Sequence, residues 1–122
     1  MSDVDTTLRA ALAIDGAVAV ALVDHGTGAS LGQAGDPGTD LAAVAAEGTD
    51  VVRAGLRAVR RLGGRDHVED VLITLGARVH LLRLLRPESG RGLFLHLVLE
   101  KEHSNLALAR RQLTLLERAL VL

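Results

Sequence analysis

A continuous apolar run from Ala17 to Val23 constrains the fold more than any other feature of this sequence. The run is bounded by Gly16 and Gly26, is too short for an isolated helix, and shows no alternation of polar and apolar residues. These properties predict a β-strand that is buried on both faces. The segment from Leu93 to Leu99 barely alternates and predicts a second strand of the same kind. A sheet that contains such strands must be covered on both faces, which predicts a three-layer structure.

Periodic apolar residues predict three helices. A short N-terminal helix ends by Gly16, and the longest helix runs from Leu41 to Leu62 and stops at Gly63-Gly64. The last helix begins near Ser104 or Asn105. Its apolar seam comprises Leu106, Ala109, Leu113, Leu116 and Leu120.

Three more segments read as strands. Ala29 to Gly35 is a weaker return strand, and Val68 to Leu75 and Arg78 to Leu85 are joined by a tight turn. Pro87 to Gly90 breaks the chain before the last strand at Leu93 to Leu99. Strands joined by short turns imply an antiparallel meander. The order α-β-β-α-β-β-β-α therefore predicts one α/β (α+β) three-layer sandwich domain over residues 1–122, with five antiparallel strands.

Composition excludes several classes of function. Fourteen basic and fifteen acidic residues nearly cancel, and Phe94 is the one aromatic residue, so we expect no nucleic-acid binding. The absence of cysteine excludes disulfides and thiolate chemistry. No apolar run approaches the ~20 residues of a membrane span. The acidic start at Asp3 and Asp5 is unlike a signal peptide, and we expect a cytoplasmic protein.

Two features suggest chemistry, and each has a simpler interpretation. The turn Asp24-His25-Gly26-Thr27-Gly28 faintly resembles the phosphate hairpin of the actin and sugar-kinase ATPases, but the second phosphate loop of that superfamily is missing. A plain hairpin turn is favoured.

His80 and His96 could face each other and bind a metal or titrate as a pair. Neither has a carboxylate or cysteine at ligand spacing, so structural roles are favoured and we expect no metal, cofactor or catalytic residue.

Several local patterns together resemble the roadblock dynein light-chain family (roadblock/light chain seven), including its bacterial members. The segment from Ile14 to Asp24 is similar to the family's glycine-led first strand, and Gly26 is similar to its turn glycine. The alanine-rich helix from Leu41 and the three-strand meander follow in the family's order. Asn105 to Arg110 is similar to the opening of its last helix. The resemblance implies a profilin-like sandwich with the long helix on one face of the sheet and the two terminal helices on the other.

The resemblance also implies a homodimer. Family members pair through the long second helix and the third strand, and commonly serve as platforms for Ras-like small GTPases. Some bacterial members act as GTPase-activating partners without chemistry of their own. We therefore expect a non-enzymatic interaction module that scaffolds or regulates such a GTPase. The residues expected at the dimer interface are Gly48, Val52, Gly55, Val59, Val68, Val71 and Ile73.

The charged face of the long helix is a candidate partner-binding stripe. It comprises Glu47, Asp50, Arg53, Arg57 and Arg60. A merely solvated face is the simpler interpretation, because charges at helical spacing are ordinary. Arg57 or Arg60 could in principle act as an arginine finger. The family resemblance argues against that role, because its GTPase-activating members act by reshaping the partner.

Gly48 and Gly55 lie seven residues apart on one face of the long helix. Glycine inside a helix costs about 1 kcal/mol relative to alanine, so both positions need an explanation. Either another backbone approaches closely there, or the glycines let the helix lie close to its own sheet. The sequence leaves both explanations open.

The sequence also leaves an alternative function open. The chain could be a small-molecule or nucleotide sensor domain with a pocket between sheet and helix. The scarcity of aromatic residues weighs against this alternative.

Overall fold

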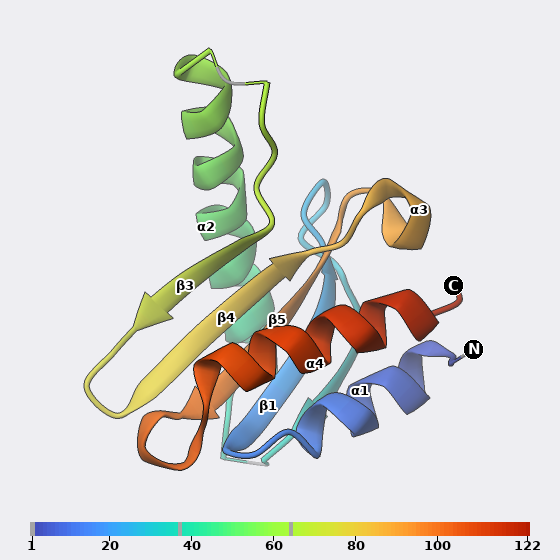
Figure 1. The fold of residues 1–122 in the computed structure, drawn as a ribbon, viewed down its shortest axis with the longest axis vertical. Helices are drawn as coiled ribbons and strands as arrows, with labels where there is room; N and C mark the ends of the chain where they lie inside the picture. The colour runs from blue at the N-terminus through green and yellow to red at the C-terminus, as the bar shows by residue number, and fades with distance from the viewer. Residues whose placement is uncertain (1, 37, 64) are drawn as a thin grey trace.

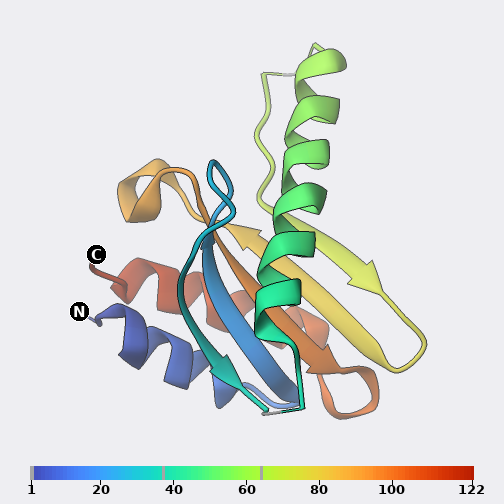
Figure 2. The ribbon, with the colours of Figure 1, turned by 180° about the vertical axis from the view of Figure 1, so that it is seen from behind.

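The computed structural model describes residues 2–36, 38–63 and 65–122. Within these residues five strands form one sheet in the order β2-β1-β5-β4-β3, and all neighbours are antiparallel (Figures 1 and 2). The strands are β1 (Ala17–Asp24), β2 (Ser30–Gly35), β3 (Asp70–Thr74), β4 (Arg78–Leu84) and β5 (Leu93–Glu100). The predicted meander of the last three strands is confirmed. Gly64, expected to stop the long helix, lies outside the described residues.

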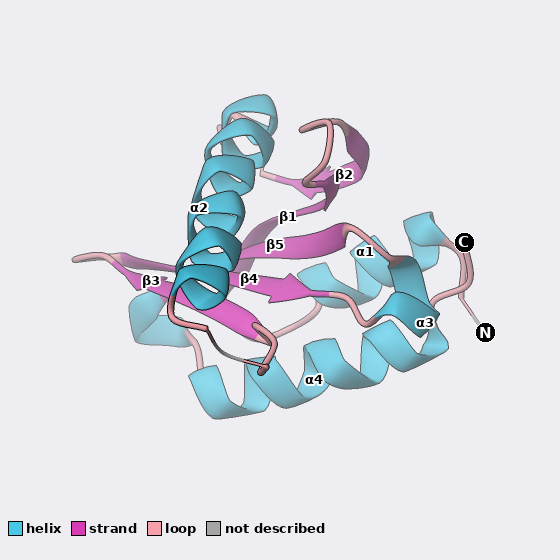
Figure 3. Cartoon of the chain, turned by 90° about the horizontal axis from the view of Figure 1, so that it is seen from above, coloured by secondary structure: helices cyan, strands magenta, loops and turns pink. Residues whose placement is uncertain are grey.

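Helices cover both faces of the sheet, as predicted. The long helix α2 (Leu41–Arg61) lies on one face, and α1 (Val4–Leu12) and α4 (Leu106–Ala119) lie side by side on the other (Figure 3). Alternate residues of the central strands point into two separate cores. Val20 and Leu22 of β1 face α1 and α4, whereas Ala21 and Val23 face α2. Burial on both faces explains why β1 and β5 read as continuous apolar runs.

Short polar side chains define where the helices begin. Asp3 accepts a hydrogen bond from the backbone N–H of Thr6 at 2.8 Å, and Asp40 accepts one from Ala43 at 3.0 Å. Asn105 caps α4 in the same way. Each cap satisfies a backbone donor that has no partner inside the helix. The expected starts of the second and last helices are therefore confirmed.

The local structure differs from the sequence prediction in three places. The segment from Pro87 to Gly90 is one helical turn, α3, rather than an irregular break, because proline at the first position of a turn is compatible with helical geometry. Residues Lys101–His103 form a 3₁₀ turn, η1, between β5 and α4, which the sequence did not predict. The third strand is also shorter than expected. It begins at Asp70 rather than Val68, and Glu69 meets β4 through a single hydrogen bond to Leu84.

Strand β3 is an edge of the sheet. It pairs with β4 from Asp70 to Thr74, and within the described residues no strand lies along its other side. An unpaired edge leaves a row of backbone donors and acceptors open to another chain.

Across the described part of the chain, no helix is long and apolar enough to cross a membrane.

Candidate interaction surface

Helix α2 extends past the sheet on which it lies. Its N-terminal half crosses the sheet, and its C-terminal half stands clear of the strands beside the segment that leads to β3 (Figures 1 and 2). The buried residues of the helix are Ala45, Gly48, Thr49 and Val52, all in the first twelve positions. The later residues are half-buried or exposed, and Leu62 at the C-cap is 85% exposed. A helix half with apolar residues and no layer beneath it is a candidate surface for a partner.

A groove of about 290 Å³ opens between α2 and the β3–β4 hairpin. Aliphatic side chains form most of its wall, and Glu47 and two histidines are its polar members. The lining residues are Ala43, Val44, Glu47, Gly48, Val51, Ile73, Leu75, His80 and His96. The groove therefore suits an apolar group more than a charged one.

The two histidines of the groove are in direct contact. The register of β4 and β5 places His80 opposite Val98 and His96 opposite Leu82, so the histidines are diagonal neighbours. Nδ1 of His80 lies 2.8 Å from Nε2 of His96. The expectation that they could face each other is confirmed. One of these two nitrogens must donate and the other must accept. The two histidines therefore cannot both carry a positive charge while this contact exists.

Burial keeps the inner histidine neutral. His96 is 3% exposed, and this burial lowers its pKa to about 4, with His80 adding to the shift and the backbone of Val44 opposing it. Burial and the nearby charge of Arg78 also lower the pKa of His80. Nδ1 of His96 makes no hydrogen bond of good geometry within the described residues. The same residues contain no group of three or more His, Cys, Asp or Glu that could hold a metal ion.

Gly48 and Gly55 have different environments. A Cβ on Gly48 would overlap Nδ1 of His96 and lie 3.2 Å from Phe94, so a side chain there would push α2 off the sheet. A Cβ on Gly55 would meet only Val71, at an ordinary 3.8 Å. Close packing on its own sheet therefore accounts for Gly48. Contacts within the described part of the chain do not account for Gly55.

The expected interface residues fall into two groups. Gly48 and Val52 are buried within the chain, where Val52 packs on the sheet. The others are half-buried along α2, the segment before β3, and β3 itself, namely Gly55, Val59, Val68, Val71 and Ile73. The structure thus brings this second group to one side of the molecule, next to the open edge of β3.

The expected charged stripe is exposed along α2 but not uniform in role. Glu47, Asp50, Arg57 and Arg60 are all exposed. Arg53 is instead engaged, because its guanidinium donates hydrogen bonds of 2.7 Å to the carbonyl oxygens of His25 and Gly26. These bonds tie the β1–β2 turn to α2.

The turn from Asp24 to Gly28 is a plain hairpin turn. The backbone N–H of Gly26 donates to the Asp24 side chain, and that of Gly28 donates to the Asp24 carbonyl, each at 2.7 Å. Thr27 accepts from Ala29. The backbone donors of both glycines are thus engaged within the chain, which favours a plain turn over a phosphate-binding hairpin.

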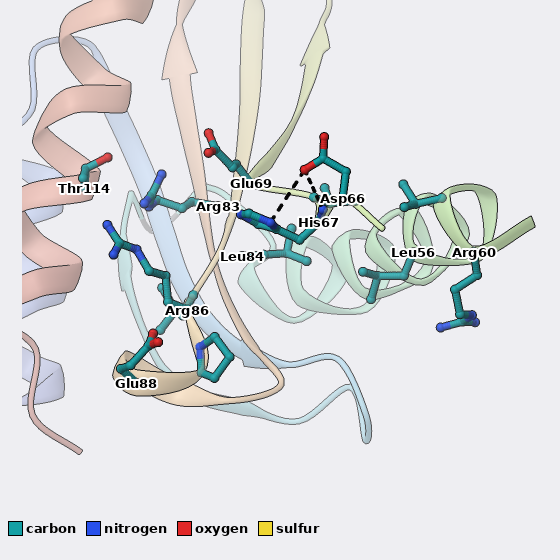
Figure 4. Close-up of a pocket in the computed structure, with 14 residues that line it drawn as sticks. Leu56, Arg60, Asp66, His67, Glu69, Arg83, Leu84, Arg86, Glu88 and Thr114 are labelled. Carbon is teal, nitrogen blue, oxygen red and sulfur yellow. Dashed lines mark hydrogen bonds and ion pairs between the residues drawn. The ribbon is translucent and has the colours of Figure 1, made fainter. Parts of the chain in front are cut away.

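A second hollow, of about 810 Å³, lies between the projecting half of α2, the segment before β3, and α3 (Figure 4). Its wall includes Arg83, which donates to the carboxylate of Glu117 at 2.8 Å. The same carboxylate accepts from the backbone N–H of Arg86. Glu117 is 2% exposed, and sequence reasoning missed it. Its position four residues after Leu113 in the apolar seam of the last helix was the available signal.

The layers, the strand order and the helix positions define a roadblock/LC7 fold. The solved roadblock/LC7 domain from Streptomyces avermitilis is 18% identical, with a TM-score of 0.82 over 97% of this chain and 94% of that one. MglB from Myxococcus xanthus is 17% identical, with a TM-score of 0.74 over 92% and 83%. The gliding protein MglB from Thermus thermophilus is 16% identical, with a TM-score of 0.68 over 93% and 87%. No protein-family model and no curated protein sequence matches the chain.

Proposed function

We propose that this chain is a non-enzymatic, homodimeric interaction module that scaffolds or regulates a Ras-like small GTPase. The observation that carries the dimer is the combination of the open edge of β3 and the projecting half of α2 on the same side of the molecule. A second copy could extend the sheet along β3 and bury the apolar residues of α2 at once. A similar MglB structure is described as having a tetrameric arrangement, which supports self-association in this fold.

The GTPase half of the proposal rests on the roadblock resemblance and on an accessible charged surface. Asp50, Arg57 and Arg60 lie on α2 away from the groove and stay exposed. Such a stripe can select a partner by charge and speed its association. A dimer formed on the groove side would leave this stripe free for the GTPase.

The dimer is tested by sedimentation of the wild type and of Gly55→Leu. We expect a dimer for the wild type and monomers for the variant. A Cβ at Gly55 makes only an ordinary 3.8 Å contact with Val71 within the chain, whereas a leucine there would clash with a partner packed on this side of α2. Ala107→Leu on the exposed face of α4 is the matched control and should remain dimeric. A monomeric wild type at high concentration would refute the proposed dimer. Folded Gly55→Leu dimers would exclude α2 as the interface.

The GTPase is tested by titration with purified small GTPases from the same organism, each loaded with GTP or with GDP. We expect one of them to bind in a nucleotide-dependent way. Arg57→Glu should weaken that binding at least tenfold while the dimer persists, and Arg111→Glu on α4 should leave it unchanged. Failure of every GTPase to bind in either nucleotide state would contradict this half of the proposal.

The hollow of about 810 Å³ favours one alternative, a small-molecule or nucleotide sensor, because its size is within the range of ligand sites. A thermal-shift screen with GTP, GDP, ATP and common metabolites tests it. A rise of several degrees that Arg86→Ala abolishes would favour the sensor. No rise at millimolar ligand would leave the interaction module as the function supported best.

A further inference from the structure

Helix α4 presents exposed leucines and arginines on its outer face. Leu108 and Leu115 are 42% and 52% exposed, and Arg111 and Arg118 are exposed beside them. Their spacing of three, four and three residues places all four on one side of the helix. The buried residues of α4 lie on its opposite side, against the sheet. We call the exposed row of Leu108, Arg111, Leu115 and Arg118 the α4 stripe.

The α4 stripe carries positive charge that the chain itself does not compensate. Glu117 is the one carboxylate of α4, and it is buried and bound to Arg83. Among the described residues, no carboxylate lies within ion-pair distance of Arg111 or Arg118. Both guanidinium groups are therefore available to an anionic partner.

The neighbouring helix α1 adds no net positive charge. Its exposed Arg9 is offset by the exposed Asp5, and Asp3 accepts the capping hydrogen bond from the backbone N–H of Thr6. The positive charge and the exposed leucines of this layer thus gather on α4 itself. Exposed leucines that alternate with arginines along one helix face are typical of helices that lie in the headgroup region of an anionic membrane.

The proposed homodimer would place two α4 stripes on one face. Helix α4 lies on the opposite face of the sheet from α2 (Figure 3). Antiparallel pairing of two identical edge strands has its two-fold axis perpendicular to the sheet, so each face of the joined sheet continues the same face of the single sheet. Pairing along β3 would therefore set both α4 stripes on the side away from α2, where one extended surface could contact both.

We propose that the α4 stripe docks this protein on an anionic lipid surface. Leu108 and Leu115 enter the headgroup region, and Arg111 and Arg118 bind lipid phosphates. This inference goes beyond the proposed GTPase module and rests on the proposed homodimer only for the doubling of the contact. A second copy is a poorer occupant of the stripe, because α4 has no exposed carboxylate to pair with the arginines of another α4. The face of α2 that we assign to the GTPase points away from the lipid.

Co-sedimentation with lipid vesicles tests the docking surface. The wild type should bind vesicles made of equal parts phosphatidylcholine and phosphatidylglycerol, bind pure phosphatidylcholine vesicles much less, and be released by high salt. Leu115→Gln and Arg118→Glu should each lower the affinity by about tenfold or more, because both stripes of a dimer lose the contact. Leu31→Gln, at a leucine of β2 that is 46% exposed, and Arg57→Glu on α2 are the matched controls and should bind like the wild type.

Tryptophan fluorescence reports whether α4 itself enters the lipid, because the chain has no tryptophan of its own. Leu115 is half-exposed, so Leu115→Trp should fold. Its emission should move to shorter wavelength when the anionic vesicles are added, since the indole leaves bulk water. Leu31→Trp should show no such shift.

The outcomes separate this inference from the proposed homodimer. A dimeric wild type that ignores anionic vesicles, or that binds them equally well after Leu115→Gln and Arg118→Glu, would overturn the docking surface and leave the homodimer standing. A wild type that is monomeric by sedimentation but binds anionic vesicles through these two residues would support the docking surface and refute the homodimer. An unchanged Leu115→Trp emission in the presence of bound vesicles would also overturn the inference.

Discussion

Gly48 of α2 lies directly against the imidazole ring of His96 on β5. The hydrogen in place of a side chain lets the helix descend onto the sheet, and the helix in turn seals the histidine from water. The two residues are 48 positions apart in the chain, and the space that the glycine leaves is filled by the histidine ring.

Gly48→Ala should destabilise the protein although alanine favours helix. The added Cβ would overlap Nδ1 of His96, and neither the helix nor the strand can move away without opening the core. We expect a loss of about 1–3 kcal/mol in the free energy of unfolding, measured by urea denaturation. Gly76→Ala, where a Cβ would meet no atom within 4 Å, is the control and should be nearly neutral. Equal stability of the two variants would contradict the packing described for Gly48.

The stability of the fold should fall in mild acid because of His96. Its pKa is lowered from 6.5 to about 4 by burial, so below pH 6.5 the unfolded chain binds a proton that the folded chain does not. The resulting loss begins as the pH falls through 6.5, is complete near pH 4, and amounts to about 3 kcal/mol. Above pH 6.5 this group should have no effect.

Urea denaturation of the wild type and His96→Leu across this pH range measures the effect. Carboxylates titrate equally in both proteins, so the difference between their pH profiles isolates the histidine. His67→Leu, at an exposed position, should follow the wild type. Parallel profiles for wild type and His96→Leu would show that the buried histidine is not responsible.

The proposed dimer should weaken in acid through His80. A second copy packed along α2 and β3 would cover the groove and remove His80 from water, and this disfavours the protonated form of His80. The charged groups nearby are Arg78 on β4, which also disfavours protonation, and Glu47 on α2, which lines the same groove and is exposed. The dimer therefore binds fewer protons than two monomers. With one His80 per copy, its dissociation constant should rise by up to about 100-fold per pH unit below the pKa of His80.

Sedimentation of the wild type and His80→Gln between about pH 7.5 and pH 5 tests this linkage. The variant dimer should depend on pH much less than the wild-type dimer, and His103→Gln, on the exposed 3₁₀ turn, should behave like the wild type. A dissociation constant that stays flat for the wild type over this range would rule out His80 as a proton-sensitive group of the interface.

Glu117→Gln should be strongly destabilising. The carboxylate accepts from Arg83 and from the backbone of Arg86, and it is almost completely buried. Removing its charge leaves the guanidinium of Arg83 largely buried without a counter-ion, which costs about 3 kcal/mol. Glu102→Gln, an exposed carboxylate, is the control. Thermal denaturation of the three proteins at neutral pH gives the comparison, and a loss below about 1 kcal/mol would mean that water screens the pair.

Much of the fold was readable because its signals are local. Asn105 was identified as a candidate start of the last helix because a cap depends on the few residues that follow it. The central strands were identified because burial on both faces leaves no polar positions in β1 and β5. Helix α3 was missed because a single turn is too short to show apolar periodicity.

The candidate surface was only partly readable. The sequence placed Gly48 and Gly55 on one helix face but could not separate their roles, because only the distance to His96 distinguishes them. Arg53 looked like its charged neighbours until the fold brought it to the carbonyl groups of the β1–β2 turn. Glu117 was overlooked because its partner, Arg83, lies 34 positions away in the chain.

The sequence by itself determined the element types, their order and the two-sided burial of the sheet, because hydrophobic periodicity and capping act over a few residues. Tertiary structure alone decided that His80 and His96 meet, that Gly48 is a packing residue, and that α2 projects beyond the sheet with Leu62 uncovered. These are long-range facts, set by strand register and by the angle at which a helix crosses a sheet. Neither the strand register nor the crossing angle can be derived directly from the pattern of residues along the chain.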